Sequence, residues 1–303
     1  MALSAEPKLS VLWATDGSAN ARNAQALLRQ LVLPAAERFA VVTVVPHFFI
    51  SGARPDPAFL TRVSPAARRR ARVEGEQLAM REATALDPPL KPEIVVRWGH
   101  PIEEILRAAR AMPADLIVLG AKGHSNIGMI LVGSVSQGVV QHARRPVLIA
   151  RPGTEAVRRI IVGYHGSGAA RRALRFLARL ALPAEAEVRL ICVVEPFGVP
   201  AGTPVSYRRL AIEEANRVNK RRHAAAQRSL DAAAAQLRAS HERVETEVLA
   251  GAAGPELDAA ARRLGADLIV VGSRKPSPAR HYLLGSTAEK LVRHAHTSVL
   301  VVR

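Results

Sequence analysis

Short apolar runs alternate with amphipathic stretches along the whole 303-residue chain. In the first half, the runs that predict strands are Leu9–Ala14, Ala40–Val45, Glu93–Trp98, Asp115–Leu119 and Pro146–Ala150. Helical patterns lie between them, over Ser18–Leu31, Pro65–Leu86, Pro101–Ala111 and Ser134–His142. Strands that alternate with helices predict a parallel sheet covered by helices on both faces. Ligands of such sheets bind beyond the carboxyl ends of the strands, where the strand order reverses.

The second half of the chain repeats the first. Asp115–Arg151 and Asp267–Arg303 are identical at 15 of 37 positions at a constant offset of 152, without a gap. Val11–Pro34 also matches Ile160–Pro183 without a gap, here at an offset of 149. The long helix of the second half is expected at about Tyr207–Ser240. The repeat predicts two homologous units, residues 1–151 and 152–303.

The charge balance is strongly basic. Lys and Arg number 43 against 26 acidic residues, a net charge of +17, and both halves share the excess. Such a surface attracts anions, which include nucleotides, nucleic acids and acidic proteins. Aromatic residues make up only 4%, too few for base-stacking platforms. We therefore interpret the charge as an arginine-rich solvated surface. Nucleic-acid binding is the alternative interpretation.

The single cysteine and the lack of long apolar runs bear on the cellular compartment of the protein and on its relation to membranes. Cys192 lies in the apolar run Val188–Val194, where we expect it to be buried. One cysteine excludes a disulfide framework and indicates a reducing compartment. No run approaches the roughly 18 apolar residues of a membrane-spanning helix. Residues 1–10 lack the pattern of a signal peptide. We expect a cytoplasmic protein without membrane insertion.

A glycine-containing loop after the fourth predicted strand carries the candidate chemistry. Gly120-Ala121-Lys122-Gly123 is followed by nine residues and then by Gly133-Ser134, which opens a helix. Glycines let a backbone approach a phosphate, and a helix start offers free N–H groups. Ser134 and Ser136 add hydroxyls. From the spacing alone, a purely structural loop and helix entry is an equal alternative.

The loop is neither of the two common phosphate-binding motifs. No GxxxxGK[ST] sequence occurs, which excludes a P-loop. The turn after the first strand is Thr15-Asp16-Gly17-Ser18, which is not a GxGxxG dinucleotide fingerprint.

The pattern G-x2-G-x9-G-[ST], continued by Val135-Ser136 and by Pro146–Ile149, resembles the universal stress protein family. The start Ala14–Ser18 and the segment Gly99–Ile105 resemble other hallmarks of that family, and the resemblance covers the chain twice. It implies two tandem α/β domains, each an open five-stranded parallel sheet in a three-layer, Rossmann-like arrangement. It also implies ATP as the ligand of the intact motif, with Mg²⁺ as a candidate companion.

The resemblance assigns roles to residues of the first unit. Asp16, beside Ala14 and Thr15, matches the position that contacts the ribose or an associated metal. Val44 matches the adenine contact. The strand end and phosphate loop would be formed by Leu119, Gly120 and Gly123, and the triphosphate-facing helix start by Gly133, Ser134, Val135 and Ser136. For Asp16, a turn residue before Gly17 is the alternative.

The second unit departs from this pattern. His165 stands where Asp16 stands, and Lys275 replaces the counterpart of Gly123, next to Pro276 and Pro278. Gly272, Gly285 and Ser286 remain. We therefore expect one ATP per chain, bound by residues 1–151.

No catalytic residue is assigned, because HExxH, GxSxG and CxxC motifs are absent from the sequence. We interpret the chain as a nucleotide-responsive stress regulator in which any ATP hydrolysis is slow. A slow ATPase or nucleotidyl-transfer enzyme on the same fold is the alternative. The two units are expected to pack as a pseudo-dimer, with a homodimer of whole chains as a further expectation. The sequence does not identify a protein partner.

Overall fold

The computed structural model describes residues 9–46, 64–121, 132–273 and 284–303. The strands of the first unit are β1 (Leu9–Ala14), β2 (Ala36–Pro46), β3 (Glu93–Gly99), β4 (Leu116–Gly120) and β5 (Val147–Ala150). Its α-helices are α1 (Ala19–Arg22), α2 (Ala24–Leu27), α4 (Pro65–Leu86), α5 (Pro101–Ala111) and α6 (Ser134–His142). Most of these bounds agree with the predicted ones to within a residue or two.

The second unit repeats this order. Its strands are β6 (Arg159–Gly163), β7 (Glu187–Val194), β8 (Val244–Ala250), β9 (Leu268–Gly272) and β10 (Ser298–Val302). Its helices are α7 (Gly168–Leu177), α8 (Val205–Arg238), α9 (Ala253–Leu264) and α10 (Ser286–His294).

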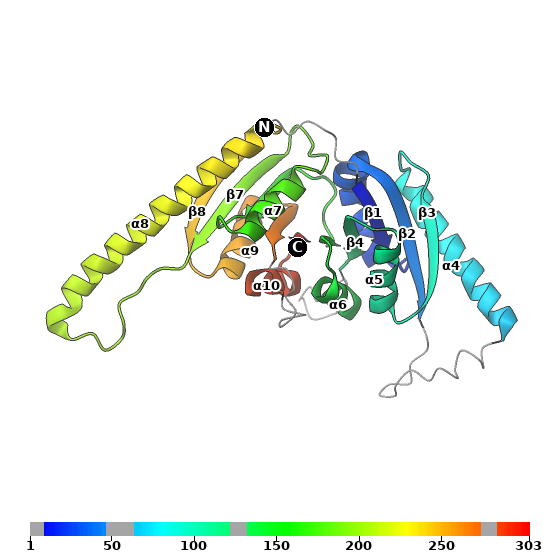
Figure 1. Ribbon diagram of the computed structural model, residues 1–303, viewed down its shortest axis with the longest axis horizontal. Coiled ribbons are helices and arrows are strands. Elements are labelled where there is room, and N and C mark those ends of the chain that lie inside the picture. Colours follow the sequence, from blue (N-terminus) through cyan, green and yellow to red (C-terminus); the bar gives the residue numbers. More distant parts are fainter. Residues whose placement is uncertain (1–8, 47–63, 122–131, 274–283) are drawn as a thin grey trace.

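All ten strands belong to one sheet, in the order β3-β2-β1-β4-β5-β10-β9-β6-β7-β8 (Figure 1). Every neighbouring pair is parallel except β5 and β10, which pair antiparallel where the units meet. The predicted α/β class with tandem units is confirmed. The predicted count of two separate sheets is wrong, because the edge strands β5 and β10 join them. Within each unit the strand order reverses once, between β1 and β4 and between β6 and β9.

Helices cover both faces of the sheet. One apolar cluster lies beneath α2, α4, α7 and α8, and the other lies beneath α5, α6, α9 and α10. Trp13, on β1, is fully buried in the first cluster. The central strands are buried on both faces, which explains their nearly continuous apolar sequence. Cys192 is a buried free thiol, as predicted, and burial raises its pKa. Within the described ranges, no helix has the length and apolarity needed to cross a membrane.

The junction between the units has two-fold pseudo-symmetry. Leu148 of β5 pairs with Leu300 of β10, and these two residues are each other's counterparts in the repeat. On either side of this pair, Val147 pairs with Val301 and Ile149 with Val299. The pseudo-two-fold axis therefore passes through the pair Leu148–Leu300.

Two buried arginines cross this junction, and we call them the reciprocal arginine caps. The guanidinium of Arg303 donates to the carbonyls of Val140 and Gln141, at the carboxyl end of α6. Its counterpart Arg151 donates to the carbonyl of Val292, the counterpart of Val140, at 2.6 Å. A cation at the carboxyl end of a helix is stabilised by the helix dipole. Each unit thus supplies the charge that caps a helix of the other.

Burial acts against the charge of both caps. Arg151 is 0% exposed and Arg303 is 7% exposed. Desolvation lowers the pKa of Arg151 to about 10, although Asp258 opposes that shift, and it lowers the pKa of Arg303 as well. With a pKa of about 10, the Arg151 guanidinium remains charged at neutral pH.

The predicted helix Ser18–Leu31 is interrupted. Ser18 is its N-cap, as predicted, and accepts from the N–H of Ala21 at 3.2 Å. The helix is divided at Asn23 and continues as a π-helical turn over Leu28–Val32. The second unit and the chain leading into it contact this segment. The N–H of Ala181 donates to the carbonyl of Leu31. The Gln30 amide donates to the carbonyl of Glu155 and accepts from the N–H of Val157. These contacts between the units accompany the departure from a regular helix.

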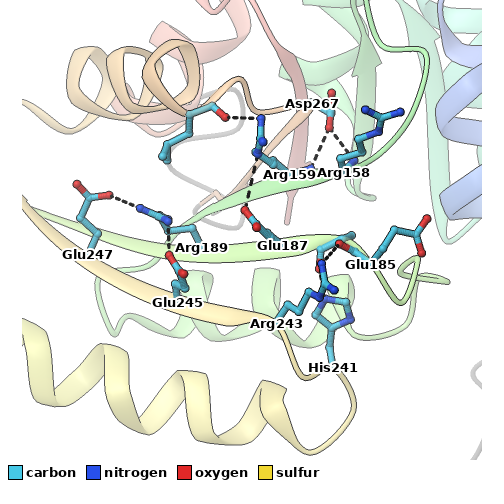
Figure 2. Close-up of polar contacts among 12 residues, drawn as sticks. Arg158, Arg159, Glu185, Glu187, Arg189, His241, Arg243, Glu245, Glu247 and Asp267 are labelled. Carbon is cyan, nitrogen blue, oxygen red and sulfur yellow. Dashed lines mark hydrogen bonds and ion pairs between the residues drawn. The ribbon is translucent and has the colours of Figure 1, made fainter.

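The outer edge of the second unit is lined with ion pairs (Figure 2). Arg189 of β7 lies between Glu245 and Glu247 of the edge strand β8 and pairs with both. Arg263 of α9 pairs with Glu247 at 2.6 Å. Charged side chains on an edge strand discourage pairing with another chain, so growth of the sheet at this edge is disfavoured.

The reciprocal arginine caps predict a stability effect. Arg303→Met keeps most of the side-chain volume but removes two charge-assisted hydrogen bonds to α6. We expect the free energy of unfolding to fall by about 2–3 kcal/mol. Urea denaturation measures this, with Arg145→Met, at an exposed arginine just after α6, as the matched control. Equal effects of the two substitutions would contradict the role given to Arg303.

Candidate functional site

The loop after β1 is tightly held, and it presents Asp16 to solvent. The N–H of Thr15 donates to the carbonyl of Val42 at 3.0 Å, and the Thr43 hydroxyl donates to the carbonyl of Thr15 at 3.1 Å. Gly17 has a φ of +72°, and its N–H donates to the Thr15 hydroxyl oxygen. Asp16 is exposed, and its Oδ1 accepts from the N–H of Ser18 at 3.0 Å. One carboxylate oxygen thus holds the turn, while Oδ2 has no partner among the residues described.

The helix α6 begins directly over the end of β4. The hydroxyl of Ser136 donates to the carbonyl of Gly120 at 2.8 Å, which fixes the first turn of the helix against the strand. Ser136 is buried, whereas Ser134 is exposed. The N-cap of α6 is Gly133, which has no side chain to accept a hydrogen bond. Where the structure is described, no side chain accepts from the first N–H groups of this helix, and these groups attract anions.

Gly120 is required for helix packing. A Cβ at this position would lie 2.0 Å from the carbonyl oxygen of Asn20 and 2.7 Å from the Cα of Ala21, at α1. Its counterpart Gly272 would meet the Ala169 oxygen at 2.3 Å. The structural alternative raised for the glycine loop therefore holds for Gly120, whatever it contributes to a ligand.

The structure brings most of the predicted site residues to one edge of the sheet. An apolar cluster on the α5 and α6 side contains Ala14, Leu119 and, at its partly buried margin, Val44 and Val135. Thr15 is buried behind the Asp16 loop. Gly123 lies outside the described residues, as do Lys275, Pro276 and Pro278. A group of three or more His, Cys, Asp or Glu side chains that could hold a metal does not occur within the described ranges.

The equivalent place in the second unit contains a cavity of about 1110 Å³, which the sequence did not predict. It lies beyond the carboxyl ends of β6, β7 and β9, at the start of α10. Its polar lining residues are Tyr164, His165, Ser167, Arg172, Ser286 and Thr287. The retained residues Gly272, Gly285 and Ser286 were the sequence signal that could have indicated it.

Comparisons with known proteins agree with the repeat and the topology. A sequence model described as the universal stress protein family matches residues 10–151 and again 156–303. A Thermus aquaticus protein described as "universal stress protein in QAH/OAS sulfhydrylase 3′region" is 33% identical over 142 residues, which cover 47% of this chain and 98% of that protein. Universal stress protein G of Shigella flexneri is 48% identical over 61 residues, covering 20% of this chain and 42% of that protein.

A solved structure matches both units together. The crystal structure of a universal stress protein from Archaeoglobus fulgidus covers 97% of this chain and 98% of its own, with a TM-score of 0.61. The two sequences are 22% identical, so this likeness shows the fold alone. The tandem fold therefore has a precedent along almost its full length.

The packing of Gly120 predicts that its substitution affects stability before binding. Gly120→Ala forces a Cβ against the backbone of α1, and we expect a loss of about 1–3 kcal/mol in the free energy of unfolding. Gly198→Ala is the matched control, because nothing lies within 4 Å of its Cβ position. Thermal unfolding without ligand measures both variants. A Gly120→Ala protein as stable as the control would show that the close approach is relieved at no cost.

Proposed function

Because the chain belongs to the universal stress protein family, we propose that its first unit binds ATP and acts as a nucleotide-responsive regulator in the stress response. The observation that carries the proposal is the uncapped start of α6, held over the end of β4 at the point where the strand order reverses. Backbone N–H groups there would receive the phosphates. The basic surface of the chain would favour the approach of the nucleotide.

Residues at the same edge of the sheet could contact the adenine, the ribose and an associated metal ion. Val44 and Leu119 offer an apolar wall for the adenine. The free oxygen of the Asp16 carboxylate would accept from a ribose hydroxyl, while the other oxygen keeps the turn closed. Mg²⁺ would be carried mainly by the phosphates, with Asp16 as the carboxylate that this loop can add.

A regulatory role is favoured over an enzymatic one by the composition of the site. Of the eleven residues assigned to it, Asp16 alone has an ionisable side chain. Hydrolysis or nucleotidyl transfer that uses both a general acid and a general base would need a second such group. We therefore propose binding with slow turnover at most. Substrate-stimulated product formation in a single-turnover assay would favour the enzyme instead.

The Asp16 loop provides the direct test. Asp16→Asn keeps an oxygen that can accept from Ser18, so the turn remains, but it removes the charge. We expect the affinity of the first site for ATP to fall about tenfold, which corresponds to about 1.4 kcal/mol. Calorimetric titration of the full chain measures it, and Glu242→Gln, at an exposed acid of the second unit, is the matched control. An unchanged ATP affinity in Asp16→Asn would remove Asp16 from the site.

A further inference from the structure

The cavity of the second unit differs from the first site in charge. At its position in the repeat, His165 replaces Asp16, and Arg172 replaces Asn23. Both replacements line the cavity. Among the described residues that line it there is no Asp or Glu. The second unit has therefore exchanged an anionic group at the strand ends for cationic or neutral ones.

Arg172 is held in a fixed position by main-chain oxygens. Its Nε donates to the oxygen of Arg303 at 3.0 Å, and its Nη2 donates to the oxygen of Ser273 at 3.2 Å. These oxygens lie just beyond the carboxyl ends of β10 and β9. The guanidinium is half-buried, and its Nη1 has no acceptor in the described part of the chain. A planar guanidinium fixed in this way retains a donor for a phosphate oxygen with little further loss of entropy.

The opposite side of the cavity supplies further donors and an apolar wall. Helix α10 begins at Ser286 after the N-cap Gly285, without a capping side chain. Ser286 and Thr287, which line the cavity, therefore lie at the positive end of the helix dipole. Ile191, Val193 and Leu257 form an apolar wall that can cover a flat ring.

From these features we propose that the cavity of the second unit binds a ligand with a di- or triphosphate chain and an apolar ring system, anchored by Arg172 and independent of a ribose diol. Its phosphates would lie between Arg172 and the start of α10. The described lining offers sugar hydroxyls only neutral acceptors and no carboxylate, so we expect the diol to contribute less than it does beside Asp16. This site is separate from the first unit, so it goes beyond the function proposed above and changes the expected stoichiometry from one ligand per chain to two unequal ones.

The test separates the two sites by the sugar. The full chain is titrated with ATP and with 2′,3′-dideoxy-ATP, which lacks the diol, at physiological salt. We expect dideoxy-ATP to bind the second site about as tightly as ATP does and the first site about tenfold more weakly, and inorganic tripolyphosphate to compete with it at the second site. Arg172→Asn, which installs the residue of the first unit, should weaken dideoxy-ATP binding at least tenfold. Arg175→Asn, at an exposed arginine of the same helix, should leave it unchanged.

Two further variants keep the result interpretable. Arg172→Lys retains the charge without the planar fork, and we expect an intermediate loss of affinity. It replaces Arg172→Asn if that protein fails to fold, which thermal unfolding reports. Asp16→Asn should weaken ATP at the first site and leave dideoxy-ATP binding intact. Absence of dideoxy-ATP binding, or binding that is insensitive to both Arg172 variants, would overturn the second site whether or not the first unit binds ATP.

Discussion

The antiparallel pairing of β5 with β10 holds the two units in one sheet, and the carboxyl edges of both units are arranged about it. The pairing centres on Leu148 and its own counterpart Leu300, and on either side Val147 meets Val301, the counterpart of Ile149. The reciprocal arginine caps add a second connection to this pairing, because they tie each unit to the end of a helix in the other.

The caps also bear on the two candidate sites. Helices α6 and α10 both begin at a candidate phosphate position and end at an arginine from the other unit. The carboxyl end of each dipole is therefore neutralised by a fixed cation, while its amino end has no capping side chain. Arg303 connects the sites more directly, because its guanidinium caps α6 and its main-chain oxygen holds Arg172.

Local sequence patterns were sufficient for most elements and insufficient for their assembly. Runs such as Leu9–Ala14 and Pro65–Leu86 were predicted with their observed bounds, because strand and helix periodicity act over a few residues. The π-helical turn at Leu28–Val32 could not be predicted, since it accompanies contacts made with the second unit. The joining of the two sheets was missed for the same reason: β5 shows the same apolar run whether its outer edge is paired or free.

The candidate site was only partly accessible from sequence. The family motif located the loop of Asp16 and the start of α6, and the structure brings these to the same end of the sheet. Gly120, in contrast, packs against α1, which only coordinates can reveal. From sequence, ligand binding was assigned to the first unit alone, because the second unit has a replaced aspartate, a replaced glycine and two added prolines. The orientation of Arg172, which depends on two main-chain oxygens distant in sequence, was not visible in the motif.

The acceptors of the reciprocal arginine caps are main-chain carbonyls. A carbonyl is present whatever side chain stands at residue 140 or 292, so only the two arginines themselves are constrained by this contact. After a duplication, the copies can therefore accumulate different side chains at their strand ends while the joint between them is retained. This interface therefore places no constraint on ligand selectivity. The two copies of one duplicated unit can evolve binding sites of different selectivity within a single chain.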